Sequence, residues 1–193
     1  MPKPSVKDAL ITGACRIFHE RGYSQATIQL IAEAAGAPKG SFINHFRDKE
    51  ELAIAALERY AIEETEVMRR ALEAPGRSAA ERVRDMFVAL ARRREGEPFC
   101  GCLMGNLAAE SSSNSDAIRL RLGSLYAATV APLAVVIAEG QAAKQISRRL
   151  TADTLAEVLF NAWEGTLLRV KVDRDARAVD AFLRVLDTLL LPD

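Results

Sequence analysis

Side chains able to read nucleic acid are concentrated in one short segment near residue 40. The segment contains a cation, a hydroxyl, an amide and an imidazole, from Lys39, Ser41, Asn44 and His45. Such groups form hydrogen bonds with base edges and phosphates. Gly40 lies among them and would let the backbone approach a phosphate closely. This composition indicates a surface that contacts double-stranded DNA.

The residues around this segment predict a helix-turn-helix. Residues 27–34 have the apolar spacing of a short amphipathic helix, and Gly36 supplies a tight turn. Pro38 suits the first turn of a second helix over about 39–45, where its missing N–H is not needed. The inward side chains would be Ile28, Ile31, Ala32, Phe42 and Phe46. The second helix of such a motif can lie in the DNA major groove.

Another helix precedes the motif. It is predicted from about residue 5 to residue 21 and is stopped by Gly22. The alternative is a three-helix cap with no role in DNA binding. The Gly-Ser-Asn-His composition of the last of these helices would then have no explanation. We therefore favour a DNA-binding domain over residues 1–48.

Helical patterns continue from residue 49 to the end of the sequence. Caps and breaks place helices at about 48–72, 78–94, 101–112, 115–143, 151–171 and 176–191. Asp48, Ser78 and Thr151 mark helix starts, and Pro132 is expected to kink the longest helix. We predict an all-α fold of about nine helices, with a larger ligand-binding and dimerisation domain over residues 49–193.

The first quarter of the chain resembles the TetR family of transcriptional repressors. The residues that match the family signature, in order and without gaps, are Gly22-Tyr23, Thr27-Ile28, Ile31-Ala32, Ala35-Gly36, Pro38-Lys39-Gly40-Ser41-Phe42, His45-Phe46 and Lys49-Glu50-Glu51-Leu52. The resemblance implies a homodimer that represses transcription from a pseudo-palindromic operator. It also implies release from the DNA when a small-molecule effector binds the C-terminal domain.

The resemblance further implies which residues contact DNA. Thr27 and Lys49 would bind phosphates. Base edges or the backbone would be contacted by Lys39, Gly40, Ser41, Ile43, Asn44 and His45. Ile43 departs from the family pattern, which usually has a Tyr that reaches the DNA backbone. Ile43 cannot donate a hydrogen bond, but its side chain could touch a thymine methyl.

The segment 99–110 stands out in the rest of the chain. Its Gly-Cys-Leu-x-Gly-Asn-Leu-x-x-Glu pattern resembles the branch of TetR regulators that includes electrophile-sensing repressors. Cys102 would lie near a helix start, where the positive end of the helix dipole favours a thiolate, and the arginines at 92–94 could assist. One hypothesis is that an electrophile modifies Cys102 as a sensor thiol. The other is that Cys102 is a small buried residue that packs its helix.

A ligand pocket is expected between the helices at about 78–171. The candidate contacts are Phe87, Cys102, Met104, Asn106, Glu110, Tyr126 and Trp163. Each of them could instead be core packing. Asn106 and Glu110 are four residues apart on an otherwise apolar helix. If buried, they need polar partners, which a ligand or Arg169 would supply.

The last two helices carry wide apolar faces. These faces contain Leu155, Leu159, Trp163, Leu167, Val170, Val179, Phe182, Leu183, Leu186 and Leu190. Two such helices from each subunit would form a four-helix dimer interface. The alternative is that these side chains complete the core of the monomer. We favour the homodimer, because a repressor contacts two half-sites about 34–36 Å apart or a multiple of that distance.

Composition limits the class of protein. The 193 residues carry no formal net charge, but residues 1–50 contain seven Lys and Arg against five Asp and Glu, which weakly supports DNA binding at that end. Three cysteines without framework spacing, and no secretory signal, predict a reduced cytoplasmic protein. The longest apolar run, near 127–138, is too short to span a bilayer, so no membrane association is expected.

Two other classes compete with the repressor. An enzyme is not expected, because no set of nucleophile, base and orienting group is recognisable. The two histidines, His19 and His45, both lie in the N-terminal region, so no catalytic residue, metal site or cofactor is expected either. The second class is a helical ligand-binding or interaction module without specific DNA binding, which the departure at Ile43 would suit.

Overall fold

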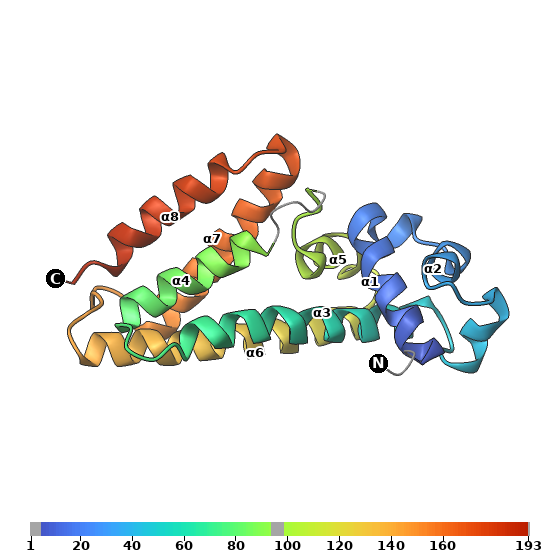
Figure 1. Ribbon diagram of the computed structural model, residues 1–193, viewed down its shortest axis with the longest axis horizontal. Coiled ribbons are helices and arrows are strands. Elements are labelled where there is room, and N and C mark those ends of the chain that lie inside the picture. Colours follow the sequence, from blue (N-terminus) through green and yellow to red (C-terminus); the bar gives the residue numbers. More distant parts are fainter. Residues whose placement is uncertain (1–4, 94–98, 193) are drawn as a thin grey trace. The chain divides into compact units, whose positions relative to one another are not determined.

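The structure is a computed structural model that describes residues 5–93 and 99–192, and it is built from helices (Figure 1). Its elements are α1 (Val6–Gln25), α2 (Ile28–Ala34), η1 (Lys39–Asn44), α3 (Lys49–Leu72), α4 (Ala79–Arg92), α5 (Leu103–Ser111), α6 (Asp116–Ala142), α7 (Ala152–Asp173) and α8 (Arg177–Leu190). η1 is a 3-10 helix and the others are α-helices. Strands are absent from the described ranges, and the all-α prediction is confirmed.

The chain divides into two compact units. The first unit contains Met1–Ile62 and Cys100–Leu125, and the second contains Glu63–Phe99 and Tyr126–Asp193. The first unit therefore holds α1, α2, η1 and α5, together with the N-terminal parts of α3 and α6. The second holds α4, α7 and α8 with the remainder of α3 and α6. The predicted boundary at residue 48 divides the chain by function, and it stays a prediction.

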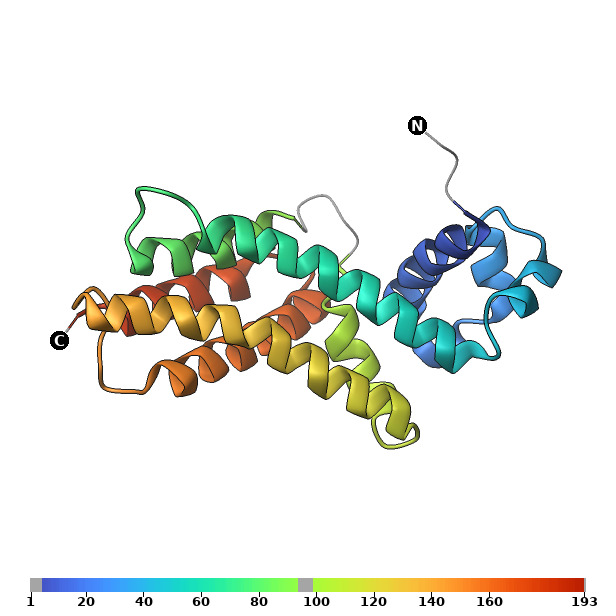
Figure 2. The same ribbon diagram turned by 90° about the horizontal axis from the view of Figure 1, so that it is seen from below.

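The first unit is built on the buried stripe of α1. The stripe contains Leu10, Ile11, Ala14, Ile17 and Phe18. α1 lies against α2, and both are drawn in blue in Figure 2. The two backbones approach closely at Gly13, where an added Cβ would lie 2.9 Å from the carbonyl oxygen of Ile31. The absence of a side chain at Gly13 therefore sets the spacing of α1 and α2.

Two glycines have the positive φ that their predicted roles require. At Gly22 φ is 79° and ψ is 167°, so α1 leaves the helical conformation there before its last residues. At Gly36 φ is 61°, which turns the chain from α2 towards η1. Such positive-φ backbone costs other residues roughly 1–3 kcal/mol. Both breaks therefore follow from residue type.

η1 differs from the helix predicted over 39–45 in its winding. The Ser41 N–H donates to the Pro38 carbonyl at 2.9 Å, and the His45 N–H donates to the Phe42 carbonyl at 2.9 Å. These are the i to i+3 bonds of a 3-10 helix. Six residues form few α-type bonds to offset the cost of nucleation, so the tighter form competes. Phe42 and Phe46 are nevertheless buried, as predicted.

The predicted helix starts are confirmed by their caps. Ser78 and Glu81 form a reciprocal capping box at α4. The Asp48 carboxylate accepts the Glu51 N–H at 2.8 Å, directly before α3. The Thr151 hydroxyl accepts the N–H three residues further on at 3.2 Å and caps α7. These bonds satisfy backbone donors that the first turn of a helix leaves without intrahelical partners.

The second unit has an aromatic core. The ring centroids of Phe87 and Phe182 are 4.8 Å apart in an edge-to-face arrangement. The Trp163 ring lies 5.6 Å from Phe87 and 5.3 Å from Phe182. These three side chains join α4, α7 and α8, and α8 packs against both other helices (Figure 1). Aromatic pairs in such tilted geometries add to the stabilisation from burial.

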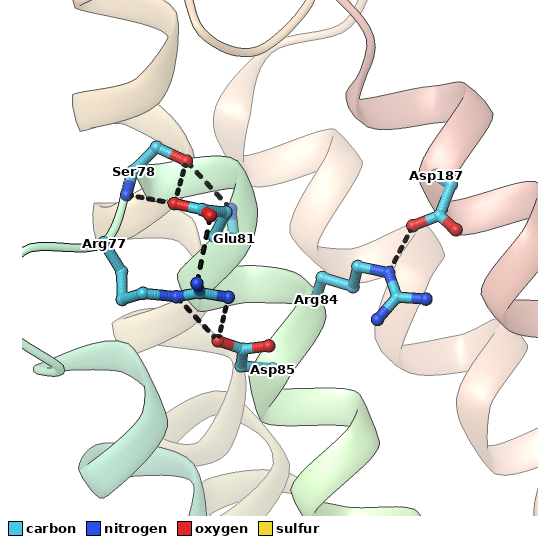
Figure 3. A network of polar contacts seen from close by, with 6 residues as sticks. All are labelled: Arg77, Ser78, Glu81, Arg84, Asp85 and Asp187. Carbon is cyan, nitrogen blue, oxygen red and sulfur yellow. Dashed lines mark hydrogen bonds and ion pairs between the residues drawn. The ribbon is translucent and has the colours of Figure 1, made fainter.

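Ion pairs also connect α4 with its own N-terminal turn and with α8 (Figure 3). The Arg77 guanidinium contacts Glu81 at 3.1 Å and Asp85 at 2.8 Å. The Arg84 Nε donates to Asp187 Oδ1 at 2.7 Å. All five side chains are more than a third exposed, so solvent screens the charges and each pair adds little stability. Burial of α8 side chains in the core therefore does more than the Arg84–Asp187 ion pair to hold α8 in place.

Helix α6 is longer than the apolar run near 127–138 suggested. It has 27 residues, contains Pro132, and by length and composition alone could cross a membrane. Its buried side chains include Ile118 and Leu122 in the first unit and Leu133 and Ile137 in the second. A core helix of a water-soluble protein passes the same length and composition test, so that test does not identify a membrane span.

Candidate nucleic-acid interface

The residues of η1 and its end divide into an inward aromatic pair and an outward face. Phe42 and Phe46 are 3% and 4% exposed, and their ring centroids are 5.9 Å apart. Ile43 is 78% exposed, and Asn44 is exposed beside it. The packed phenylalanines fix the rotation of η1 about its axis, because a buried ring cannot leave the core without a cavity. The outward residues are therefore presented to solvent in a defined orientation.

Gly40 belongs to this outward face, and packing within the chain does not require its missing side chain. A Cβ built at Gly40 would meet no described atom within 4 Å. Bare backbone on an exposed face allows a phosphate to approach closely. Ser41 and His45 are half-buried at the edges of the face. Lys39 begins η1, but its side chain lies outside the described part of the chain.

Thr27 is the N-cap of α2. Its hydroxyl oxygen accepts the Leu30 N–H at 3.2 Å, and the side chain is exposed. A hydroxyl that accepts one hydrogen bond can still donate its own proton. The predicted contact between Thr27 and a phosphate is compatible with this geometry and stays a prediction.

Lys49 binds carbonyl groups of its own chain. Its Nζ donates to the carbonyls of Tyr23 at 3.1 Å and Ala26 at 3.2 Å, and lies 4.3 Å from the centroid of the Tyr23 ring. Burial of that ring, with the carboxylates of Glu50 and Asp48 nearby, raises the pKa of Tyr23. An ammonium has three donors, so two carbonyls leave one for a phosphate. Lys49 thus has a structural role, and its phosphate contact stays a prediction.

Two further cations flank the outward face and were not among the predicted DNA contacts. The Arg47 side chain is 85% exposed, and its Nε donates to Glu51 at 3.0 Å. The backbone N–H and guanidinium of Arg47 hold the pKa of Glu51 below its usual value. The Lys7 Nζ lies 5.6 Å from the centroid of the Phe46 ring. Arg47 follows Phe46 in sequence, but only the fold brings Lys7 to the same edge.

The cysteine segment directly precedes α5, and Cys102 is the N-cap of that helix. Cys102 is 8% exposed, and Cys100 is half-buried. The Asn106 backbone N–H donates to the Cys102 carbonyl at 2.9 Å, and its side-chain amide donates to the Cys100 carbonyl at 2.8 Å. The N-cap position suits a sensor thiol, and the burial suits a packing residue. Both hypotheses for Cys102 therefore survive the structure.

Of the arginines expected to assist Cys102, Arg93 is paired with carboxylates. Arg93 pairs with Glu63 at 2.8 Å and with Glu64 at 2.9 Å inside the second unit. Arg92 is exposed in the last turn of α4, and Arg94 lies outside the described residues. The structure therefore adds no support for arginine assistance at Cys102.

Arg169 has a partner on its own helix, and its expected pairing with Asn106 or Glu110 stays a prediction. Arg169 pairs with Asp173 one turn further along α7, at 2.7 Å. Glu110 is exposed, and its carboxylate accepts the Ser24 N–H at 3.0 Å. Asn106 is satisfied in part by the cysteine segment. The chain itself thus supplies partners that Arg169 or a ligand was expected to supply.

The remaining predicted ligand contacts are distributed over both units. Met104 is buried in the first unit, whereas Phe87 and Trp163 fill the aromatic core of the second. The Tyr126 ring lies 6.0 Å from the Phe160 ring, also in the second unit. A pocket of about 290 Å³ in that unit is lined by Ser147, Arg149, Leu150, Leu155, Thr188, Leu189, Leu191 and Pro192. None of these was predicted as a ligand contact, and the predicted ligand contacts stay predictions.

Most of the apolar side chains behind the dimer prediction lie in the monomer core. The buried members are Leu155, Leu159, Trp163 and Leu167 of α7 and Phe182, Leu186 and Leu190 of α8. The competing interpretation was therefore right for these residues. A different set, called here the α7–α8 face, contains Val158, Leu168, Val172 and Val185, which are 45%, 60%, 69% and 57% exposed. Exposed large apolar side chains on two helices that pack together make these helices the candidate interaction surface.

Two protein-family models match the chain. The model described as Bacterial regulatory proteins, tetR family, matches residues 10–56. The model described as Tetracyclin repressor-like, C-terminal domain, matches residues 79–186. The first match contains α2 and η1, and the second extends from α4 into α8.

Relatives extend these matches over nearly the whole chain. The HTH-type transcriptional repressor DhaR of Mycobacterium sp. (strain GP1) is 35% identical over 192 residues, which are 100% of this chain and 96% of DhaR. The transcriptional regulator AcuR of Cereibacter sphaeroides is 30% identical to this chain, and the match covers 91% of this chain and 81% of AcuR. The crystal structure of regulatory protein TetR from Rhodobacter sphaeroides matches with a TM-score of 0.90 at 28% sequence identity. The match covers 95% of this chain and 98% of that structure. The chain belongs to the TetR family of bacterial transcriptional regulators.

Proposed function

We propose that this protein is a cytoplasmic repressor that binds a pseudo-palindromic operator as a homodimer and leaves it when a small-molecule effector binds. The observation that carries the proposal is the division of η1 and the two residues after it into a buried pair, Phe42 and Phe46, and an outward face with Gly40, Ile43 and Asn44. Among the described residues, Ile43 is the most exposed large apolar side chain. A thymine methyl would give it an apolar partner.

Titration of labelled DNA with the protein tests the proposal. Fluorescence anisotropy would compare DNA from upstream of the protein's own gene with a shuffled duplex of equal length, at increasing salt. Specific binding should persist at about 0.15 M salt, with a Kd on the order of 10⁻⁸ M or lower. Binding only at low salt, with no preference between the duplexes, would favour a helical module without specific DNA recognition.

Lys49→Ala should weaken binding to the operator and to the shuffled duplex alike. The substitution removes a cation expected at a phosphate, so the slope of log K against log salt should become shallower by about one. The anisotropy titration at four or more salt concentrations measures this slope. Weaker binding with an unchanged slope would leave Lys49 with only its role on the Tyr23 and Ala26 carbonyls.

The homodimer is proposed to form through the α7–α8 face, although not through the side chains first expected there. The exposed valines and leucine would be buried between two copies related by a two-fold axis. Each copy of the dimer supplies one η1, so the dimer has one such element for each of two half-sites.

Effector release is proposed to involve Cys102, with an electrophile as the class of effector. Cys102→Ser should change operator affinity by less than about twofold, as is usual for a conservative change away from the DNA-contacting face. It should abolish release by N-ethylmaleimide, in which the thiolate sulfur adds to the maleimide double bond and a proton completes the adjacent carbon. Cys15→Ser is the matched control and should be released like the parent protein. Release that persists in Cys102→Ser would assign Cys102 to packing.

A further inference from the structure

Two hydrogen bonds, called here ties, connect α1 with the two ends of α5 inside the first unit. At the N-terminal end of α5, the His19 Nε2 lies 2.8 Å from the Gly101 carbonyl oxygen, and since a carbonyl only accepts, the histidine donates. At its C-terminal end, the Ser24 N–H donates to Glu110 Oε2 at 3.0 Å. The two ties lie on either side of Gly22, where α1 leaves the helical conformation.

The tie at Glu110 depends on the glycine beside it. A Cβ built at Gly22 would lie 3.1 Å from the Glu110 Cδ, which is closer than side chains normally approach. Gly22 also has a φ of 79°, a conformation that other residues rarely adopt. The bare backbone at Gly22 therefore gives the Glu110 carboxylate access to the Ser24 N–H.

Glu110 and Lys49 both bind the backbone of the same turn. Glu110 accepts from the Ser24 N–H, and Lys49 donates to the carbonyls of Tyr23 and Ala26, the residues around it. The next residue is Thr27, which caps α2. The turn over residues 23–26 thus leads from the end of α1 directly into the helix-turn-helix.

The opposite tie reaches the cysteine segment directly. Gly101 lies between Cys100 and Cys102, and its φ is 77°. The His19 ring that holds its carbonyl also packs edge-on against the Tyr60 ring of α3, at 5.8 Å. Both cysteines therefore adjoin a backbone carbonyl that α1 contacts.

We propose that Glu110 and His19 are positioning residues that transmit the state of the cysteine segment and α5 to the helix-turn-helix. This inference rests on the proposed repressor function and names its route of regulation. Coupling between two sites is reciprocal: if α5 controls operator affinity, operator binding must change the environment of the cysteine segment. A residue that only stabilised the fold would not create that reciprocity.

The test measures the rate at which N-ethylmaleimide alkylates Cys102, with and without saturating operator, by mass spectrometry of the peptide. When the two states exchange faster than alkylation, the alkylation rate follows their populations, so the parent protein should show rates that differ by about fivefold or more with and without operator. In Glu110→Ala the two rates should become equal, and Glu110→Gln, which keeps an acceptor oxygen, should restore part of the difference. Glu20→Ala removes an exposed carboxylate of α1 and is the matched control, with the parent ratio expected. A parent ratio in both Glu110→Ala and His19→Ala would overturn the inference.

Hydrogen exchange without DNA separates the inference from the repressor proposal. Glu110→Ala should speed exchange of the α2 amides as well as of Ser24, while α7 and α8 exchange as in the parent protein. If the parent protein binds no DNA specifically, the repressor proposal fails. The exchange pattern then shows by itself whether the hydrogen bond between Glu110 and Ser24 acts on α2. Faster exchange limited to the Ser24 amide would show that the tie does not act on α2, and would overturn the inference.

Discussion

Leu168→Glu is expected to convert the protein into monomers and to lower its operator affinity by at least about a hundredfold, because a monomer contacts one half-site instead of two. Leu168 is 60% exposed on the α7–α8 face, so the glutamate can be accommodated in the isolated chain. In a dimer the same carboxylate would be buried without a partner, which is strongly unfavourable. Sedimentation velocity measures the mass, and anisotropy with the operator measures the affinity.

The chain offers a matched control for this prediction. Val135 is 59% exposed on α6, outside the α7–α8 face, and Val135→Glu introduces the same charge at a similar exposure. It should leave both the mass and the operator affinity as in the parent protein. A Leu168→Glu protein that remains dimeric and binds the operator tightly would remove α7 from the interface.

Gly13→Ala is expected to lower the free energy of unfolding by about 1–3 kcal/mol, the usual cost of forcing extra volume into a packed contact. The new Cβ would lie 2.9 Å from the Ile31 carbonyl oxygen and 3.1 Å from the Ala35 backbone nitrogen. Both are backbone atoms, so α1 and α2 must separate to accept it. Operator affinity should fall as well, because α2 and η1 are then displaced.

Gly123→Ala makes the same chemical change where there is room for it. Gly123 is exposed in α6, and a Cβ there would meet no described atom within 4 Å. Alanine in a helix with open space should stabilise the protein by about 0.4–1 kcal/mol, chiefly by restricting the unfolded chain. Urea unfolding followed by circular dichroism measures both variants. Equal effects of the two substitutions would contradict the close approach of α1 and α2.

Local features of the fold were predictable because their causes lie within a few residues. The capping box at Ser78 and the caps at Asp48 and Thr151 mark helix starts through bonds that span three residues. Gly22 and Gly36 mark breaks because glycine tolerates positive φ. The 3-10 winding of η1 was missed, since the sequence pattern of a six-residue helix does not separate it from an α-helix.

Only the tertiary structure shows which side chains are buried and which residues distant in sequence contact one another. The apolar pattern of α7 placed Leu159 on a wide apolar face, but it did not show that the monomer's own core buries this residue and that Leu168, outside that face, is an exposed apolar side chain. The pairing of Glu110 with Ser24 joins residues far apart in sequence. Pattern and spacing therefore determined the helices, the turn and the outward face of η1, since those depend on local backbone chemistry. Partners and available surfaces depend on which helices pack together, and only the assembled core establishes that.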